Sequence, residues 1–316
     1  MFVKRKYKKE NKNSSHSFNK LCNSLIFVAV SFELLKNNTM KKIITSIFVL
    51  LISNFVFSQS ALPIDTSKQF EEKTIKHFID NGAYKHSYYH PEWRKNFDSA
   101  IALLPNKAFL YQQQAMPLYK RHKYEAGKPY LDKAVELNKQ EYLPYRGFMN
   151  CIFRKNYHDA IVDFTEAKRL WGNGFEMDHE YDFYIALSYL QLNNFDSAKI
   201  LFEKCIETES EKYGAKYVHQ LNYFYLAITE SEFENYPIAV SYLDSCLVRY
   251  PNFSDAQYYK ACFLKHIDKN YDSQPLLHEA YNNSRDGYSI TEDNTFYEKY
   301  PYQMDDRNIK SALRDK

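Results

Sequence analysis

The chain has 316 residues, of which 45% are hydrophobic and 26% are charged, so it can bury a sizeable core and does not have a disordered composition. Only 7 glycines accompany 29 tyrosines and 23 phenylalanines, which argues against glycine-rich phosphate-binding loops and favours helices packed through aromatic rings. Residues 59–316 hold 32 Lys and Arg against 37 Asp and Glu, a net charge of −5, so the total of +3 belongs to the N-terminal part. A mildly acidic product has no bulk attraction to nucleic acid or anionic lipid, and we expect neither as a partner.

Residues 40–58 have the pattern of a secretory signal peptide. Two lysines follow Met40, an apolar run extends from Ile43 to Phe57, and Val56 and Ser58 stand three and one positions before Gln59. The run is about 15 residues, shorter than the ~20 of a membrane-spanning helix, so we expect cleavage before Gln59 and no integral membrane segment afterwards. The product would be periplasmic or secreted. An uncleaved anchor is the alternative.

Residues 1–39 form a basic leader rich in Asn and Ser that precedes this pattern. A signal peptide normally begins at its own methionine, which favours translation from Met40. A long targeting segment that begins at Met1 is the alternative, and the sequence leaves it open.

A polar linker, residues 59–69, leads into a helical pattern from about Ser67 to Asn81. Residues 82–93 read as a loop because they contain Gly82 and Pro91. A second helical pattern then runs from Trp93 to Leu104. The chain therefore begins with a pair of helices.

A repeated ladder of apolar residues follows. An aromatic residue opens a helix each time after a polar pair, with a small residue three positions on, a large one seven on and a small one ten on. The last rung recurs at spacings of 34, 33, 38, 41 and 34 residues from Ala100 to Ala280. The four complete ladders are Tyr124, Gly127, Leu131, Ala134; Tyr157, Ala160, Phe164, Ala167; Phe195, Ala198, Phe202, Cys205; and Tyr236, Ala239, Leu243, Cys246.

This ladder resembles the tetratricopeptide repeat (TPR) family, whose unit is a helix-turn-helix of 34 residues. The resemblance implies an all-α fold, an α-solenoid of about six repeats over residues 70–287, with residues 288–316 as a C-terminal tail and capping helix. Two longer spacings place insertions at 171–178 and 209–216, which we expect to face solvent. Pro117 and Pro129 lie within predicted helices and are expected to bend them.

Catalytic, cofactor and metal sites are not predicted. His86 and His90 stand four apart, but Pro91 makes a continuous helix there doubtful, and His179-Glu180 lacks the second histidine of a metalloprotease motif. No pair of cysteines has the spacing of a zinc site. Cys205 and Cys246 occupy small rungs of the ladder, which favours buried thiols for Cys151, Cys205, Cys246 and Cys262 over disulfides.

The resemblance also implies a surface for a peptide or a partner helix on the inner side of the first helices. The basic clamp of some family members is not matched, because of the corresponding positions only Arg146 is of a suitable type. We therefore predict a non-enzymatic interaction module or assembly scaffold. A self-associating structural component and an enzyme with a loop-borne site are the alternatives, and the same rings could instead fill the core. The predicted contact residues are Phe109, Gln112, Met116, Tyr119, Tyr142, Tyr145, Met149 and Phe183.

Overall fold

A computed structural model describes residues 66–292 and 294–314 of the chain. The predicted leader and signal peptide, residues 1–58, and most of the predicted linker lie outside the described residues. The chain divides into two compact parts, Met1–Phe70 and Glu71–Lys316. The fold described below is that of the second part, together with residues 66–70, which begin its first helix. None of the described helices is both long and apolar enough to cross a membrane.

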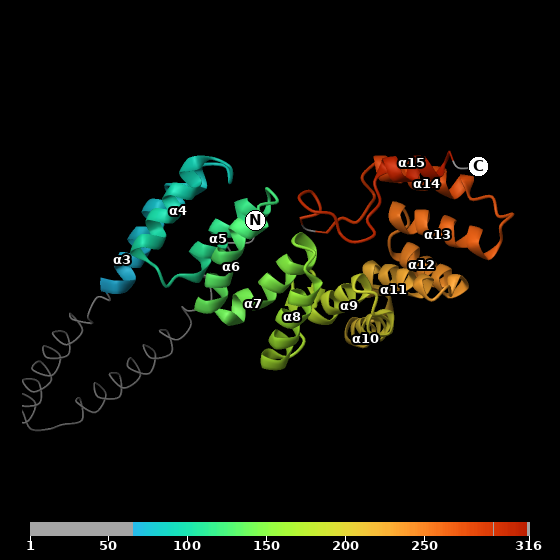
Figure 1. Ribbon diagram of the computed structural model, residues 1–316, viewed down its shortest axis with the longest axis horizontal. Helices are drawn as coiled ribbons and strands as arrows, with labels where there is room; N and C mark the ends of the chain where they lie inside the picture. Colours follow the sequence, from blue (N-terminus) through green and yellow to red (C-terminus); the bar gives the residue numbers. More distant parts are fainter. Residues whose placement is uncertain (1–65, 293, 315–316) are drawn as a thin grey trace, which may run out of the picture. The chain divides into compact units, whose positions relative to one another are not determined.

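The described residues form thirteen α-helices and one minimal β-hairpin, which confirms the predicted all-α fold (Figure 1). The α-helices of the first half are α3 (Thr66–Thr74), α4 (Pro91–Leu103), α5 (Ala108–Tyr119), α6 (Tyr124–Leu137), α7 (Lys139–Phe148) and α8 (Tyr157–Trp171). Those of the second half are α9 (Tyr181–Gln191), α10 (Phe195–Tyr213), α11 (Gln220–Glu232), α12 (Tyr236–Arg249), α13 (Ser254–Ile267), α14 (Gln274–Arg285) and α15 (Asp306–Ala312). Short π or 3-10 turns are η2 (Ile75–Asp80), η3 (Ala83–Lys85), η4 (Met149–Phe153) and η5 (Ala215–Tyr217), and the hairpin pairs β1 (Phe175–Glu176) with β2 (His179–Glu180).

Helices that are consecutive in sequence pack against each other. The hairpins α5–α6, α9–α10, α11–α12 and α13–α14, together with α7–η4–α8 and the α3–η2–α4 segment, make six units, and each unit also contacts the next. This is the α-solenoid arrangement that the sequence predicted. The short tail helix α15 packs against α14, at the end of the row (Figure 1).

The ladder is the buried face of each second helix. Its large residues Leu131, Phe164, Phe202 and Leu243 are completely buried. Its small residues are buried too, and the alanines and cysteines among them are at most 1% exposed. The small rungs let the two helices of a hairpin approach closely: a Cβ added to Gly127 would lie 2.7 Å from the ring of Tyr119. The aromatic residues that the sequence predicted as helix openings are the first residues of α6, α8, α10 and α12.

The final unit departs from this pattern, as the sequence indicated. Tyr271 lies one place out of phase, and α14 begins instead at Gln274 after a short connection from Asp268. The predicted capping helix is also present: α15 begins after Asp305, whose side chain accepts from the backbone N–H of Asn308 at 2.9 Å.

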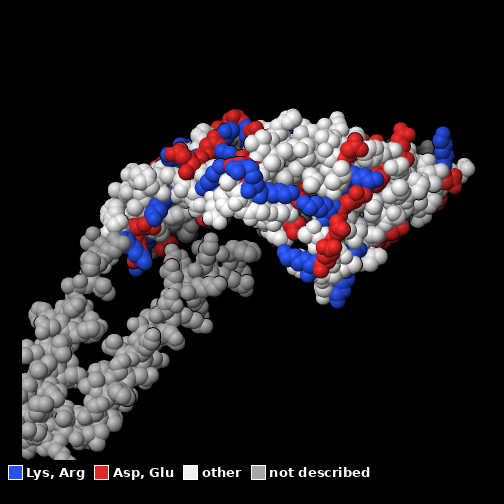
Figure 2. Space-filling model, turned by 90° about the horizontal axis from the view of Figure 1, so that it is seen from below, with Lys and Arg blue, Asp and Glu red and all other residues white. Residues whose placement is uncertain are grey.

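Charged residues on the outside are mixed in sign. Figure 2 shows basic and acidic side chains lying side by side over one face of the described residues. Arg146 binds Asp163 at 2.7 Å and Asp132 at 2.9 Å, and Lys204 binds the buried Asp182 at 2.9 Å. These pairs link neighbouring helices.

Candidate functional site

We call residues 288–305 the tail. Its described residues form no regular helix, and they lie along the first helices of several successive hairpins. The tail leaves α14, passes α13, α11 and α9, reaches the turn between α5 and α6, and returns to α13 before α15 (Figure 1). Ile290 and Tyr300 of the tail are each 3% exposed and belong to the main hydrophobic core. We call the surface that the tail contacts the tail track.

Side chains of the tail track bind the main chain of the tail. The hydroxyl of Tyr225 in α11 donates to the carbonyl of Pro301 at 3.0 Å, and the ammonium of Lys155 donates to the carbonyl of Lys299. Asp255 in α13 accepts from the backbone N–H of Met304 at 2.5 Å. These bonds reach backbone groups, so this part of the track binds the main chain of an extended segment.

Glu298 anchors the far end of the tail at the turn between α5 and α6. The hydroxyl of Tyr124 donates to its carboxylate at 2.5 Å, and His122 lies 3.1 Å from the same oxygen. Beside it the ammonium of Lys120 lies between the rings of Tyr88 and Tyr297, 4.4 Å and 4.3 Å from their centres. The tail therefore connects the last hairpin with the second.

Asp255 carries the strongest polar contacts at the other end. Its carboxylate also accepts from the hydroxyl of Ser289 at 2.8 Å, so it binds both the beginning and the end of the tail. Burial raises the pKa of Asp255 to about 6, against the opposing effect of these hydrogen bonds.

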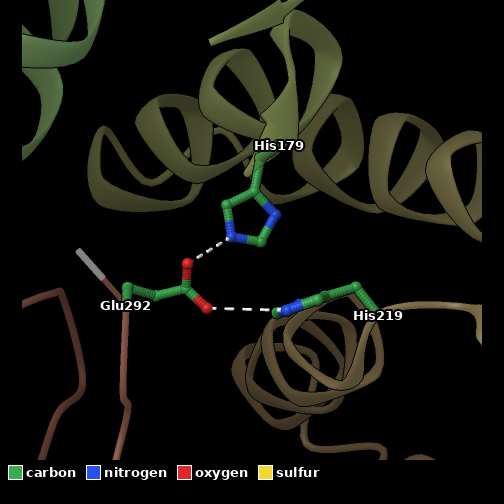
Figure 3. A group of neighbouring side chains, drawn as sticks. All are labelled: His179, His219 and Glu292. Carbon is green, nitrogen blue, oxygen red and sulfur yellow. Dashed lines mark hydrogen bonds and ion pairs between the residues drawn. The ribbon is translucent and has the colours of Figure 1, made fainter. Parts of the chain in front are cut away.

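A second polar cluster joins the tail to two hairpins. His179 Nε2 lies 3.1 Å from Glu292 Oε2, and His219 Nε2 lies 3.6 Å from Glu292 Oε1 (Figure 3). The ring of His179 is stacked on Phe183, with 3.8 Å between the ring centres. Burial and the neighbouring His179 lower the pKa of His219 to about 4, so its ring is neutral.

Sequence reasoning missed this cluster. It considered His179 only with its neighbour Glu180, as part of a protease motif, and did not consider His219 or Glu292. A signal was present, since His179 stands seven residues before Ala186 and His219 eight before Ala227, the matching small residues of two successive units. Nearly equal register places the two rings at the starts of neighbouring first helices. Glu292 had no such signal because the tail lies outside the repeat.

The eight predicted contact residues divide into two groups. Tyr119, Tyr142, Met149 and Phe183 are between 1% and 7% exposed, so in this structure they are packing residues. Phe109, Gln112, Met116 and Tyr145 are half-buried on α5 and α7, and the hydroxyl of Tyr145 lies 2.7 Å from the sulfur of Met116. Only the second group offers surface to a partner.

Other residues singled out by the sequence have structural roles. His86 and His90 are stacked with 4.6 Å between ring centres, and His90 Nδ1 accepts from the backbone N–H of Glu92 at the start of α4. The four cysteines of the described residues are free; three are buried and Cys262 is half-buried. Burial raises the pKa of Cys151 to about 11, which leaves its thiol unreactive at neutral pH.

Comparison with known proteins locates one repeat. Residues 185–212, which include most of α9 and α10, match the family model described as tetratricopeptide repeat. No curated protein sequence matches the chain.

Several solved structures are similar to the chain at low identity. YrrB, described as a TPR protein with an unusual peptide-binding site, has 17% identity and a TM-score of 0.43, with 60% of this chain and 93% of that one covered. PilW, a type IV pilus biogenesis factor, has 10% identity and a TM-score of 0.48, with coverage of 70% and 92%. Yeast Tom70 has 24% identity and a TM-score of 0.46, with coverage of 62% and 40%.

Proposed function

The chain is a tetratricopeptide repeat protein, and we propose that it is a non-enzymatic interaction scaffold whose first helices bind an extended segment of a partner protein. The observation that carries the proposal is the tail track. It already holds an extended chain, through side chains of β2, α6, α11 and α13 and of the turn that precedes α8.

The partner would bind beyond the far end of the tail. The tail reaches only the residue after α5 and the first residue of α6, at Lys120 and Tyr124. The half-buried residues of α5 and α7 continue the same row of first helices, and their amide, thioether and phenol groups suit both apolar contact and hydrogen bonding to a peptide. These are Phe109, Gln112, Met116 and Tyr145.

The proposed compartment is the periplasm or the outside of the cell, because residues 40–58 have the pattern of a signal peptide. Mass spectrometry of the native N-terminus checks this part. A chain that begins at Gln59 is the expected result. Retention of residues 1–58 in the native protein would contradict export by this route.

Site-specific photocrosslinking tests the binding face. A photoreactive residue in place of Gln112 should give a discrete crosslinked product with a cell-envelope fraction. The same photoreactive residue in place of Ile200, which is 64% exposed on α10, serves as the control for non-specific crosslinking. Equal crosslinking at both positions would contradict the assignment. A product of twice the chain mass would show self-association in place of a separate partner.

A further inference from the structure

The three residues in Figure 3 all lie where the chain departs from the regular repeat. His179 belongs to β2, directly after the first insertion, and His219 follows the second insertion as the N-cap of α11. Glu292 belongs to the tail. The packing of the hairpins brings one side chain from each departure to a single point.

The geometry of this point resembles a set of metal ligands. One donor atom from each residue lies within 4.8 Å of the other two. Zinc bonds to imidazole nitrogen and to carboxylate oxygen are about 2.0–2.2 Å long, so a tetrahedral ion keeps its ligand atoms roughly 3.3 Å apart. His179 Nε2 lies 3.1 Å from Glu292 Oε2, which is close to this separation. His219 Nε2 lies 3.6 Å from the other carboxylate oxygen, Oε1, so its ring and the carboxylate must draw together around a shared ion.

Among the described residues, no Lys or Arg forms an ion pair with Glu292. The side chain of Glu292 is only 7% exposed, and its two ion-pair partners are imidazoles. A buried carboxylate is costly unless a positive charge or several hydrogen bonds accompany it. Neutral histidine and ionised glutamate are the forms in which these side chains bind a metal.

We propose that His179, His219 and Glu292 bind a divalent cation of the zinc class. This ion fastens the tail to the starts of the hairpins α9–α10 and α11–α12. The set supplies three protein ligands and leaves one position for water. Because Glu292 comes from the tail and the histidines from the track, the ion would hold the tail in place.

The surroundings of the two rings determine how tightly the ion is held. His219 Nδ1 accepts from the backbone N–H of Leu221 at 3.3 Å, so binding at Nε2 requires the ring proton to move to Nδ1 and this bond to be given up. His179 Nδ1 is buried without a hydrogen-bond partner among the described residues. Ligating histidines usually donate their second N–H, and loss of that partner lowers affinity by about 10–100-fold. We therefore expect a reversible site that a chelator empties.

Titration of the chain from Gln59 onward with ZnCl2 near neutral pH tests the proposal. Calorimetry should show one equivalent bound, and Co²⁺ in its place should give the intense visible absorption of a tetrahedral complex. Glu292→Gln keeps the size of the side chain and removes its charge, so it should weaken binding by at least about tenfold. His86→Gln combined with His90→Gln is the matched control, because these two histidines are also stacked on each other but lie outside the cluster, so their loss should leave binding unchanged.

A second readout follows the tail itself. Zinc should slow cleavage by trypsin after Lys299 in the native chain and have no effect on this cleavage in the Glu292 variant. Circular dichroism establishes that the variant is folded, and His219→Gln replaces it if it is not. Absence of bound zinc in the native chain, or zinc binding that is equally strong without Glu292, would overturn the proposal.

Discussion

At the scale of single residues, the close approach of two helices depends on one missing methyl group. Gly127 lies in α6 directly under the buried ring of Tyr119, and its added Cβ would be 2.7 Å from two carbons of that ring. Alanine is a better helix former than glycine by about 1 kcal/mol, so helix propensity alone would predict that Gly127→Ala stabilises the protein. The overlap with the ring of Tyr119 would lower the stability by more than the helix propensity raises it.

Gly127→Ala is therefore expected to destabilise the chain by about 1–3 kcal/mol, because the added methyl group would overlap the ring of Tyr119, which is only 1% exposed. Urea unfolding monitored by circular dichroism measures the change. Ser241→Ala, at a surface position of the equivalent helix α12, is a suitable control and should change stability by less than about 0.5 kcal/mol. A Gly127 variant as stable as the native chain would show that the hairpin can open without cost.

Asp255 predicts a pH dependence. Its pKa is raised by burial from 3.8 to about 6, so the folded state binds a proton more tightly than the unfolded state. The contribution of Asp255 to stability is then greatest below pH 4 and is lost as the pH rises through about 6. A shift of about two units corresponds to roughly 3 kcal/mol.

Asp255→Asn keeps the acceptor for Met304 and removes the titration. Its stability relative to the native chain should therefore rise by roughly 2–3 kcal/mol between pH 4 and pH 7. Urea unfolding of both chains at the two pH values checks this. A stability difference that is the same at both would show that Asp255 is ionised throughout this range.

At the scale of the elements, the turn between the two helices of each hairpin has a fixed conformation. His122, Lys155, Asn193 and Glu234 occupy the same position, and all have φ between 53° and 60°. The residue that follows each of them is the N-cap of the next helix, and Asn156 and Asn194 cap through their side chains. This explains the polar pair that precedes each aromatic in the sequence.

Glu234→Gly is expected to stabilise the chain by about 0.5–1 kcal/mol, because glycine adopts positive φ without the steric cost that other residues incur. Thermal unfolding provides the measurement. The same replacement one residue earlier, Phe233→Gly, removes a ring at φ −88° and should destabilise. A loss of stability at position 234 would mean that the turn is not under strain.

At the scale of the whole described unit, the tail is part of the fold. Ile290 and Tyr300 extend the core that the hairpins build, and polar contacts join the tail to five of the six units. A solenoid held only by contacts between neighbouring repeats can unfold in parts. A segment that crosses several repeats should make them unfold together.

Tyr300→Ala is therefore expected to cost about 3–5 kcal/mol and to broaden the unfolding transition. Phe296→Ala, in the same tail but at a side chain that is 91% exposed, should change stability by less than about 0.5 kcal/mol. Differential scanning calorimetry with both variants gives the comparison. Equal effects of the two substitutions would show that the tail does not contribute to the core.

The sequence alone determined the all-α class, the helix-turn-helix repeat, the first residue of four second helices and the residues of their buried face. It could do so because these features depend on contacts between residues fewer than about 40 positions apart, which recur with the repeat. The sequence did not separate buried from half-buried residues on the inner face. Helix register places Phe183 and Phe109 on comparable positions and cannot show which of them a later segment or a neighbouring ring covers.

Only the tertiary structure decided the course of the tail and the meeting of His179, His219 and Glu292. Glu292 lies 113 residues from His179 and has no place in the repeat, so no periodicity relates the two. Their contact depends on the summed geometry of several hairpins, each of which shifts and rotates the next. Local patterns determine each unit of such a chain, whereas contacts across many units depend on how the units stack in three dimensions.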